Sequence, residues 1–194
     1  MKSLMLLITL ALFTDIALAG PLEDGVAAFK ARDYARALQL WQPLAQEGNA
    51  DAQYNLGLLY HKGWGVARDM KQAHEWYTQA ANQGNTDAMY NLGVMYISGD
   101  GVFRSDRQAL PLFEHAAARG HVPAMYNLGV MYAYGIGTGQ DAARAIELWE
   151  QAVAKGSREA REALVQAYAQ GLMGLALDPA KAAQWRSGAA KNSE

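Results

Sequence analysis

The sequence predicts an all-α protein, an α-solenoid of helix–turn–helix units with a 36-residue period. The first observation is a heptapeptide, YNLGVMY, at residues 90–96, which returns unchanged at 126–132 and as YNLGLLY at 54–60. The second is that apolar residues inside each copy recur at the three- and four-residue spacing of one helix face. The third is that a glycine-rich turn follows each copy at the same distance. A fixed period of this length is the sequence signature of stacked repeats.

Composition narrows the class of protein further. The 194 residues are 51% hydrophobic and 19% charged, which is ordinary for a globular chain. A formal charge of -2 without a run of Lys or Arg argues against a nucleic-acid or anionic-membrane partner. The chain has no cysteine, so disulfides, thiol catalysis and Cys-ligated zinc are excluded. Apolar burial therefore has to hold the fold together.

The first 19 residues have the layout of a secretory signal peptide. Lys2 provides the positive start, residues 4–13 are mostly apolar, and a small-residue site allows cleavage after Ala19. An uncleaved membrane anchor is the alternative, but Asp15 interrupts an apolar run that must reach about 20 residues to span a bilayer. We therefore expect no stable membrane span after cleavage. Export without disulfides favours a periplasmic or secreted protein of a Gram-negative bacterium.

The period divides the rest of the chain into stacked units. A helix pair at 20–48 is expected to cap the N-terminus, and a degenerate fourth repeat with a C-terminal cap is expected at 157–194. The regular repeats between them are 49–84, 85–120 and 121–156. In each, a polar residue such as Asn49 or Asp69 stands where a helix N-cap is needed. One aromatic column runs through all units at positions 41, 77, 113, 149 and 185.

At these residues the chain resembles the Sel1-like repeat family, which is related to the tetratricopeptide repeats. The resemblance rests on A-x-x-x-L-G-x-x-Y in the first helix, G-x-G-V in the turn and W-Y/F-x-x-A-A-x-x-G in the second helix. It is close over 49–156 and looser over 157–190, where Val165 replaces the glycine of the first helix. The resemblance implies a protein–protein interaction scaffold rather than an enzyme. Some relatives are described as binding β-lactams, so a cell-wall-related hydrolase or β-lactam-binding protein stays open as an alternative. A secreted virulence or host-interaction factor is a further alternative.

The glycine inside the first helix predicts a close approach of the second helix. A glycine in a helix interior costs about 1 kcal/mol relative to alanine. Gly57, Gly93 and Gly129 nevertheless occupy the same register in all three regular repeats. We expect that there is no room for a Cβ atom at this position.

The asparagine of the same stretch is the main candidate for binding. Asparagine is a mediocre helix former, yet Asn55, Asn91 and Asn127 all lie in mid-helix. One interpretation is that each amide stabilises the packing of neighbouring helices. The other is a ladder on the concave face that hydrogen-bonds an extended peptide, since the similar position lines the groove of tetratricopeptide relatives. Further candidates for partner binding are Lys62, Tyr134 and Trp64. Trp64 lies in a turn, where it is either an exposed aromatic for a partner or half-buried in packing.

No catalytic, metal or cofactor site is predicted. The four histidines lack the spacing of a zinc site, and the EF-hand ligand series is missing. S-x-x-K, G-x-S-x-G and P-loop sequences are absent as well. The sequence therefore predicts an exported scaffold or adaptor that binds a peptide or a partner protein in a concave groove.

Overall fold

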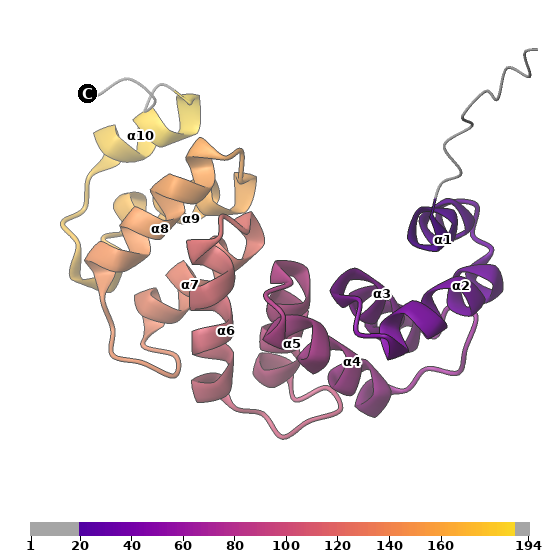
Figure 1. Ribbon diagram of the computed structural model, residues 1–194. Helices are drawn as coiled ribbons and strands as arrows, with labels where there is room; N and C mark the ends of the chain where they lie inside the picture. Colours follow the sequence, from indigo (N-terminus) through magenta and orange to yellow (C-terminus); the bar gives the residue numbers. More distant parts are fainter. Residues whose placement is uncertain (1–19, 189–194) are drawn as a thin grey trace, which may run out of the picture.

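The computed structural model describes residues 20–188, and helices are the dominant element in that range (Figure 1). The predicted signal peptide lies outside the described residues. No strand occurs between 20 and 188, where a single 3-10 turn, η1, covers Leu172–Gly174. The helices are α1 (Pro21–Lys30), α2 (Tyr34–Gln46), α3 (Ala50–Lys62), α4 (Met70–Asn82), α5 (Thr86–Ser98), α6 (Asp106–Ala118), α7 (Val122–Tyr134), α8 (Ala142–Ala154), α9 (Arg158–Gln170) and α10 (Pro179–Ser187).

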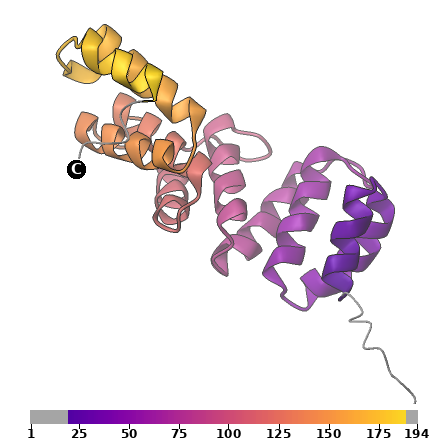
Figure 2. The same ribbon diagram turned by 90° about the horizontal axis from the view of Figure 1, so that it is seen from above.

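The helices stack in sequence order, as a solenoid requires. Extensive contacts within 20–188 join only elements that follow one another along the chain. The pairs follow an arc from α1 to α10, and the view from above shows the same progression (Figures 1 and 2). The first helices of the units, α3, α5, α7 and α9, begin at residues 50, 86, 122 and 158, which is the predicted period. The prediction of an all-α solenoid is confirmed.

The helices begin at side-chain caps that repeat with the same period. Asn49 and Asn85 each accept a hydrogen bond from a backbone N–H three residues on, both at 2.9 Å. His121 replaces asparagine in the third repeat and accepts through Nδ1 at 3.1 Å. These caps also join repeats, because Asn85 donates to Asp51 at 3.0 Å. Local capping and repeat stacking are therefore coupled.

The core contains the predicted aromatic column. Its members are nearly inaccessible to solvent: Trp41, Tyr77, Phe113, Trp149 and Trp185. Alanines of the second helices surround them and let neighbouring helices approach closely. The burial of this column supplies the apolar area that a cysteine-free chain needs.

The glycines of the first helices lie directly against that column. A Cβ atom built on Gly57 would be 2.6 Å from the ring of Tyr77. On Gly93 it would be 2.7 Å from Phe113, a separation that real Cβ contacts essentially never show. The predicted close approach of the second helix is confirmed.

The last unit departs from the regular geometry. Val165 stands where the regular repeats have glycine, and Trp185 opposite is 9% exposed. Between α9 and α10 the backbone passes through η1, in which Met173 adopts a left-handed φ of 60°. Asp178 still caps α10 by accepting from the Lys181 N–H at 2.8 Å.

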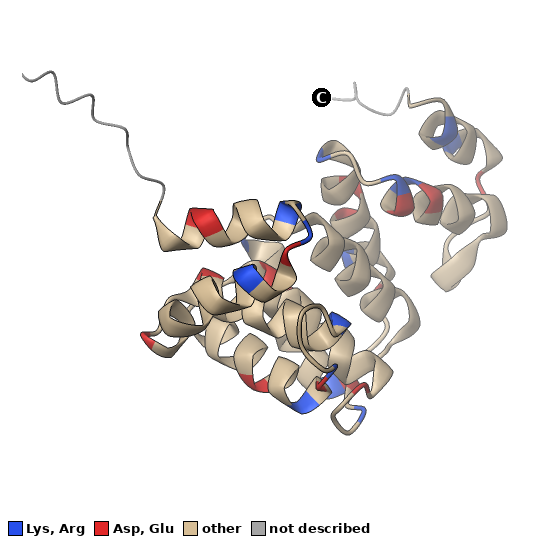
Figure 3. Ribbon diagram, turned by 90° about the vertical axis from the view of Figure 1, so that its right-hand side faces the viewer, with Lys and Arg blue, Asp and Glu red and all other residues tan. Residues whose placement is uncertain are grey.

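The charged residues are spread along the helices. Figure 3 shows both signs interspersed on the ribbon, without a continuous stretch of either. Every helix within 20–188 is too short or too polar to serve as a membrane-spanning segment.

Candidate partner-binding groove

The first helices α3, α5, α7 and α9 share a surface on which the candidate residues recur. We call this surface, with its pockets between α5 and α7 and between α7 and α9, the first-helix groove. Asn55, Asn91 and Asn127 lie half-buried at equivalent positions of α3, α5 and α7. Their surroundings differ from repeat to repeat, so each position is described separately.

Asn91 takes part in a polar cluster between α3 and α5. Its side chain forms hydrogen bonds with the hydroxyls of Tyr54 and Tyr77. The Tyr77 hydroxyl also lies 3.3 Å from His61 Nδ1, and the rings of Tyr54 and Tyr77 are 6.0 Å apart. Burial raises the pKa of both tyrosines. They therefore stay neutral and keep their hydroxyl protons for these bonds.

His61 is the titratable member of this cluster near neutral pH. Burial lowers the pKa of its imidazole most, Lys62 and Arg68 lower it further, and Asp100 opposes them. The unfolded chain would titrate near the ordinary value of about 6.5. The folded protein therefore binds fewer protons than the unfolded chain as the pH falls below that value.

We expect stability to decrease in mildly acidic solution for this reason. The contribution of neutral His61 is complete above the unfolded pKa and is lost as pH falls through the depressed folded pKa. The measurement is urea denaturation roughly one pH unit above and one below the ordinary value of about 6.5. His61→Gln should show a smaller difference between the two conditions. Equal differences for the two proteins would contradict the assignment.

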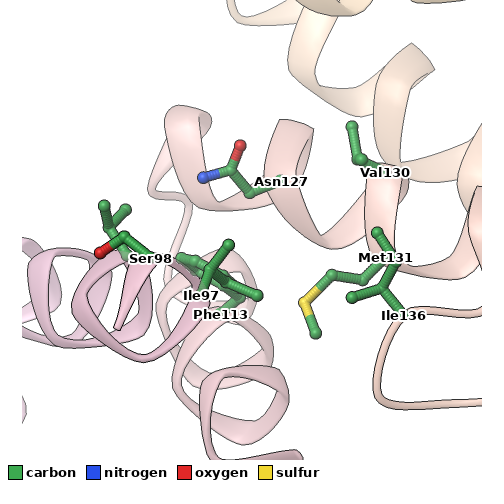
Figure 4. Close-up of a pocket in the computed structure, with 8 residues that line it drawn as sticks. Ile97, Ser98, Phe113, Asn127, Val130, Met131 and Ile136 are labelled. Atoms are coloured by element: carbon green, nitrogen blue, oxygen red, sulfur yellow. The ribbon is translucent and has the colours of Figure 1, made fainter. Parts of the chain in front are cut away.

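The junction between α5 and α7 contains an apolar pocket of about 190 Å³. Figure 4 shows side chains from both helices around this space, with the Asn127 amide at its rim. Within residues 20–188 the Asn127 side chain has no hydrogen-bond partner. The lining residues are Val94, Ile97, Ser98, Phe113, Asn127, Val130, Met131 and Ile136.

A second pocket of about 230 Å³ lies between α7 and α9. It combines the aromatic rings of Tyr126, Tyr134 and Trp149 with the carboxylates of Glu159 and Glu162. The Trp149 indole N–H donates to the Tyr126 carbonyl at 3.2 Å, so this ring is held in place. Val130 lines this pocket and the apolar one, so the two are adjacent.

The remaining candidates fall into two groups. Lys62 and Tyr134 occupy equivalent positions at the ends of α3 and α7, and Tyr134 is 62% exposed. Trp64 is half-buried, with its ring stacked on Tyr34 at 5.1 Å and near Phe29 at 5.6 Å. It belongs to the packing of the N-terminal cap, and the structure does not bring it together with the asparagines.

Sequence reasoning did not single out Ile97, Ile136, Glu159 or Glu162. Periodicity marks positions that repeat, whereas these residues differ from their counterparts one period earlier, which are His61, Asp100, Pro123 and Tyr126. A comparison of the variable positions at each register would have found them. Among residues 20–188, no group of three metal-ligating side chains comes together.

A comparison with protein families identifies this repeat. The Sel1 repeat profile matches five segments: 17–49, 50–85, 86–121, 122–157 and 163–192. The chain belongs to the Sel1 repeat family. Proteins with Sel1 repeats commonly mediate protein–protein interactions and are generally non-enzymatic scaffolds. A comparison with curated proteins finds no match.

Solved Sel1 repeat structures have the same fold. A protective antigen present in uropathogenic Escherichia coli strains is 33% identical, with a TM-score of 0.82 over 88% of this chain. This chain spans 37% of that protein's length. A Sel1 repeat protein from Oxalobacter formigenes is 31% identical, with a TM-score of 0.79 over 89% of this chain and 71% of its own. Cysteine-rich protein B of Helicobacter pylori, at 18% identity and a TM-score of 0.52 over 73% of this chain and 96% of its own, shares the fold alone.

Proposed function

We propose that this Sel1 repeat protein is an exported scaffold that binds a peptide or a partner protein in the first-helix groove. The observation that carries the proposal is the pair of adjacent pockets between α5, α7 and α9, with the Asn127 amide, which has no partner within 20–188, beside them. The Asn127 amide is half-buried and has no partner within 20–188, and a peptide backbone offers both a donor and an acceptor for it. Asn55 likewise has no side-chain hydrogen bond within 20–188.

Loss of the asparagine amides should abolish capture of the partner. The experiment uses immobilised protein in an envelope extract, with the Asn55/Asn91/Asn127→Ala variant beside the wild type. Asn82→Ala is the matched control, because Asn82 is exposed at the end of α4, a second helix. The triple variant should lose a partner that the control retains, and the purified partner should then bind wild type in solution. Equal capture by all three proteins would contradict groove binding.

The triple variant also requires a test of folding. Asn91 is bonded to two tyrosines, so its removal leaves hydroxyls short of a partner, whereas Asn127 has no such bond to lose. The single Asn127→Ala variant should therefore keep wild-type stability and still weaken binding. Normal binding by Asn127→Ala would show that other residues of the groove bind the partner.

Export is the second part of the proposal, and it rests on the signal-like first 19 residues. The mass of the protein recovered from a Gram-negative periplasm should correspond to a chain that begins at Gly20. Ala19→Arg should block processing and leave the longer chain. A full-length mass for the wild-type protein would show that the segment is not cleaved.

A host-facing role is a second candidate function. It is favoured by the similarity to a protein described as a protective antigen present in uropathogenic E. coli strains. Detection of the protein outside intact cells would favour this role, whereas confinement to the periplasm would favour an envelope scaffold.

A further inference from the structure

The junctions between consecutive first helices carry different chemistry at equivalent positions. The position at the end of the first helix is His61 between α3 and α5, but Ile97 between α5 and α7. The aromatic column beneath it changes from Tyr77 to Phe113, and the turn residue from Asp100 to Ile136. Three polar groups are thus replaced by apolar ones within one period.

The pocket at the apolar junction between α5 and α7 has the size of a single side chain. Its pocket of about 190 Å³ is smaller than the 300–1,000 Å³ that small-molecule sites occupy. A cavity of about 150 Å³ accommodates benzene. The pocket between α5 and α7 therefore suits one bulky apolar side chain, such as leucine, isoleucine, methionine or phenylalanine.

The preceding junction cannot accept the same side chain. There Tyr77 is bonded to His61 and Asn91, and an apolar group that displaced these bonds would leave buried polar atoms unpaired. An extended ligand with one apolar anchor consequently has one place for it along the groove. This difference between junctions determines the register of binding.

The following junction favours a positive charge. Glu159 and Glu162 line the pocket between α7 and α9. Glu159 accepts a hydrogen bond from the Ser157 hydroxyl at 3.0 Å, and neither carboxylate forms an ion pair within residues 20–188. Arg158, Arg161 and Arg186 line a separate cavity on the α10 side of the same helix, and Glu162 borders both cavities. The faces of Tyr126 and Tyr134 add a surface that attracts cations.

We propose that the groove binds an extended peptide segment with a bulky apolar side chain between α5 and α7 and a Lys or Arg between α7 and α9. Val130 lines both pockets, so the two side chains lie at a short, fixed spacing along the extended segment. This inference rests on the proposed function, since it assumes that the groove binds peptides. It adds the chemistry and the register of the ligand.

Selection from a random peptide library on the purified protein tests this proposal. The selected peptides should be enriched in an apolar residue at a constant spacing from a Lys or Arg. Replacing the apolar residue of a selected peptide by alanine should weaken binding about tenfold or more. Selected peptides without this pattern would overturn the proposal.

Protein variants at each junction assign each preference to its place in the groove. Ile97→His/Phe113→Tyr introduces the residues found one period earlier, which that position of the fold already accepts, and should remove the preference for an apolar anchor. Ile136→Asp is the second variant for the same junction, should the first fail to fold. Glu162→Lys should reverse the preference from basic to acidic residues, whereas Glu147→Lys, an exposed position on α8, should leave it unchanged. Unaltered preferences in the groove variants would contradict the assignment.

The outcomes separate this inference from the function on which it rests. If no peptide is selected, or if selected peptides bind the Asn55/Asn91/Asn127→Ala variant as well as wild type, the groove does not bind peptides. If selected peptides need the asparagines but show neither preference, groove binding stands and the proposed ligand chemistry is wrong.

Discussion

Replacing Phe113 by alanine is expected to lower the free energy of unfolding by about 3–5 kcal/mol. Phe113 is 1% exposed, lies against Gly93 and contacts the ring of Tyr90 at 5.9 Å. Removal of the Phe113 ring leaves a cavity next to an existing pocket, so few neighbouring side chains can move in to fill it. Stability in a solenoid depends on contacts between neighbouring units, and this side chain takes part in such contacts at the centre of the stack.

Urea denaturation followed by circular dichroism measures this effect. Phe103→Ala is the matched control, because Phe103 lies in the turn before α6 and is 96% exposed. The control should change stability by no more than about 0.5 kcal/mol. Similar losses for Phe113→Ala and Phe103→Ala would show that the aromatic column does not carry the stability assigned to it.

Replacing Gly129 by alanine is expected to destabilise the protein, although the same change in an open helix is stabilising. Alanine would contribute about 1 kcal/mol through its helix propensity. Its Cβ atom, however, would lie 2.4 Å from the Trp149 indole nitrogen. Displacing the indole also breaks its hydrogen bond to the Tyr126 carbonyl. Overpacking costs about 1–3 kcal/mol and a lost hydrogen bond about 1 kcal/mol, so a net loss of about 1–3 kcal/mol is expected.

The sign of the change is the informative result. Gly139→Ala is the control, since nothing lies within 4 Å of a Cβ atom at Gly139. The control should be neutral or slightly stabilising, because alanine restricts the unfolded chain. A higher urea midpoint for Gly129→Ala than for wild type would remove the argument for close helix packing.

The two stability predictions concern positions that the sequence already marks. The glycine and the aromatic residue recur with the period, so their contact could be inferred before the structure was known. The capping residues Asn49 and Asp69 are another example, since each accepts hydrogen bonds from the backbone at the helix start. Such features are local or identical in every unit, and therefore periodicity alone is enough to find them.

The pockets, by contrast, depend on residues that differ between the units. The sequence marks Asn91 and Asn127 as equivalent, but in the structure Asn91 is bonded to Tyr54 and Tyr77 whereas Asn127 is unpaired. One of the two hydroxyls is lost because phenylalanine replaces tyrosine at position 113, and Tyr90, the counterpart of Tyr54, packs against the His121 ring at 4.9 Å. Trp64 shows the same dependence, because Phe29 and Tyr34 from the N-terminal cap enclose part of its ring.

The sequence by itself determined the repeat, its period, its helix caps and its buried column. These depend on contacts along one helix or on contacts that every unit reproduces. Only the tertiary structure decided which junction is polar, which is apolar and which carries carboxylates that form no ion pair among residues 20–188. Each junction combines side chains from three helices of two successive units, and the residues that differ between units determine how those side chains meet.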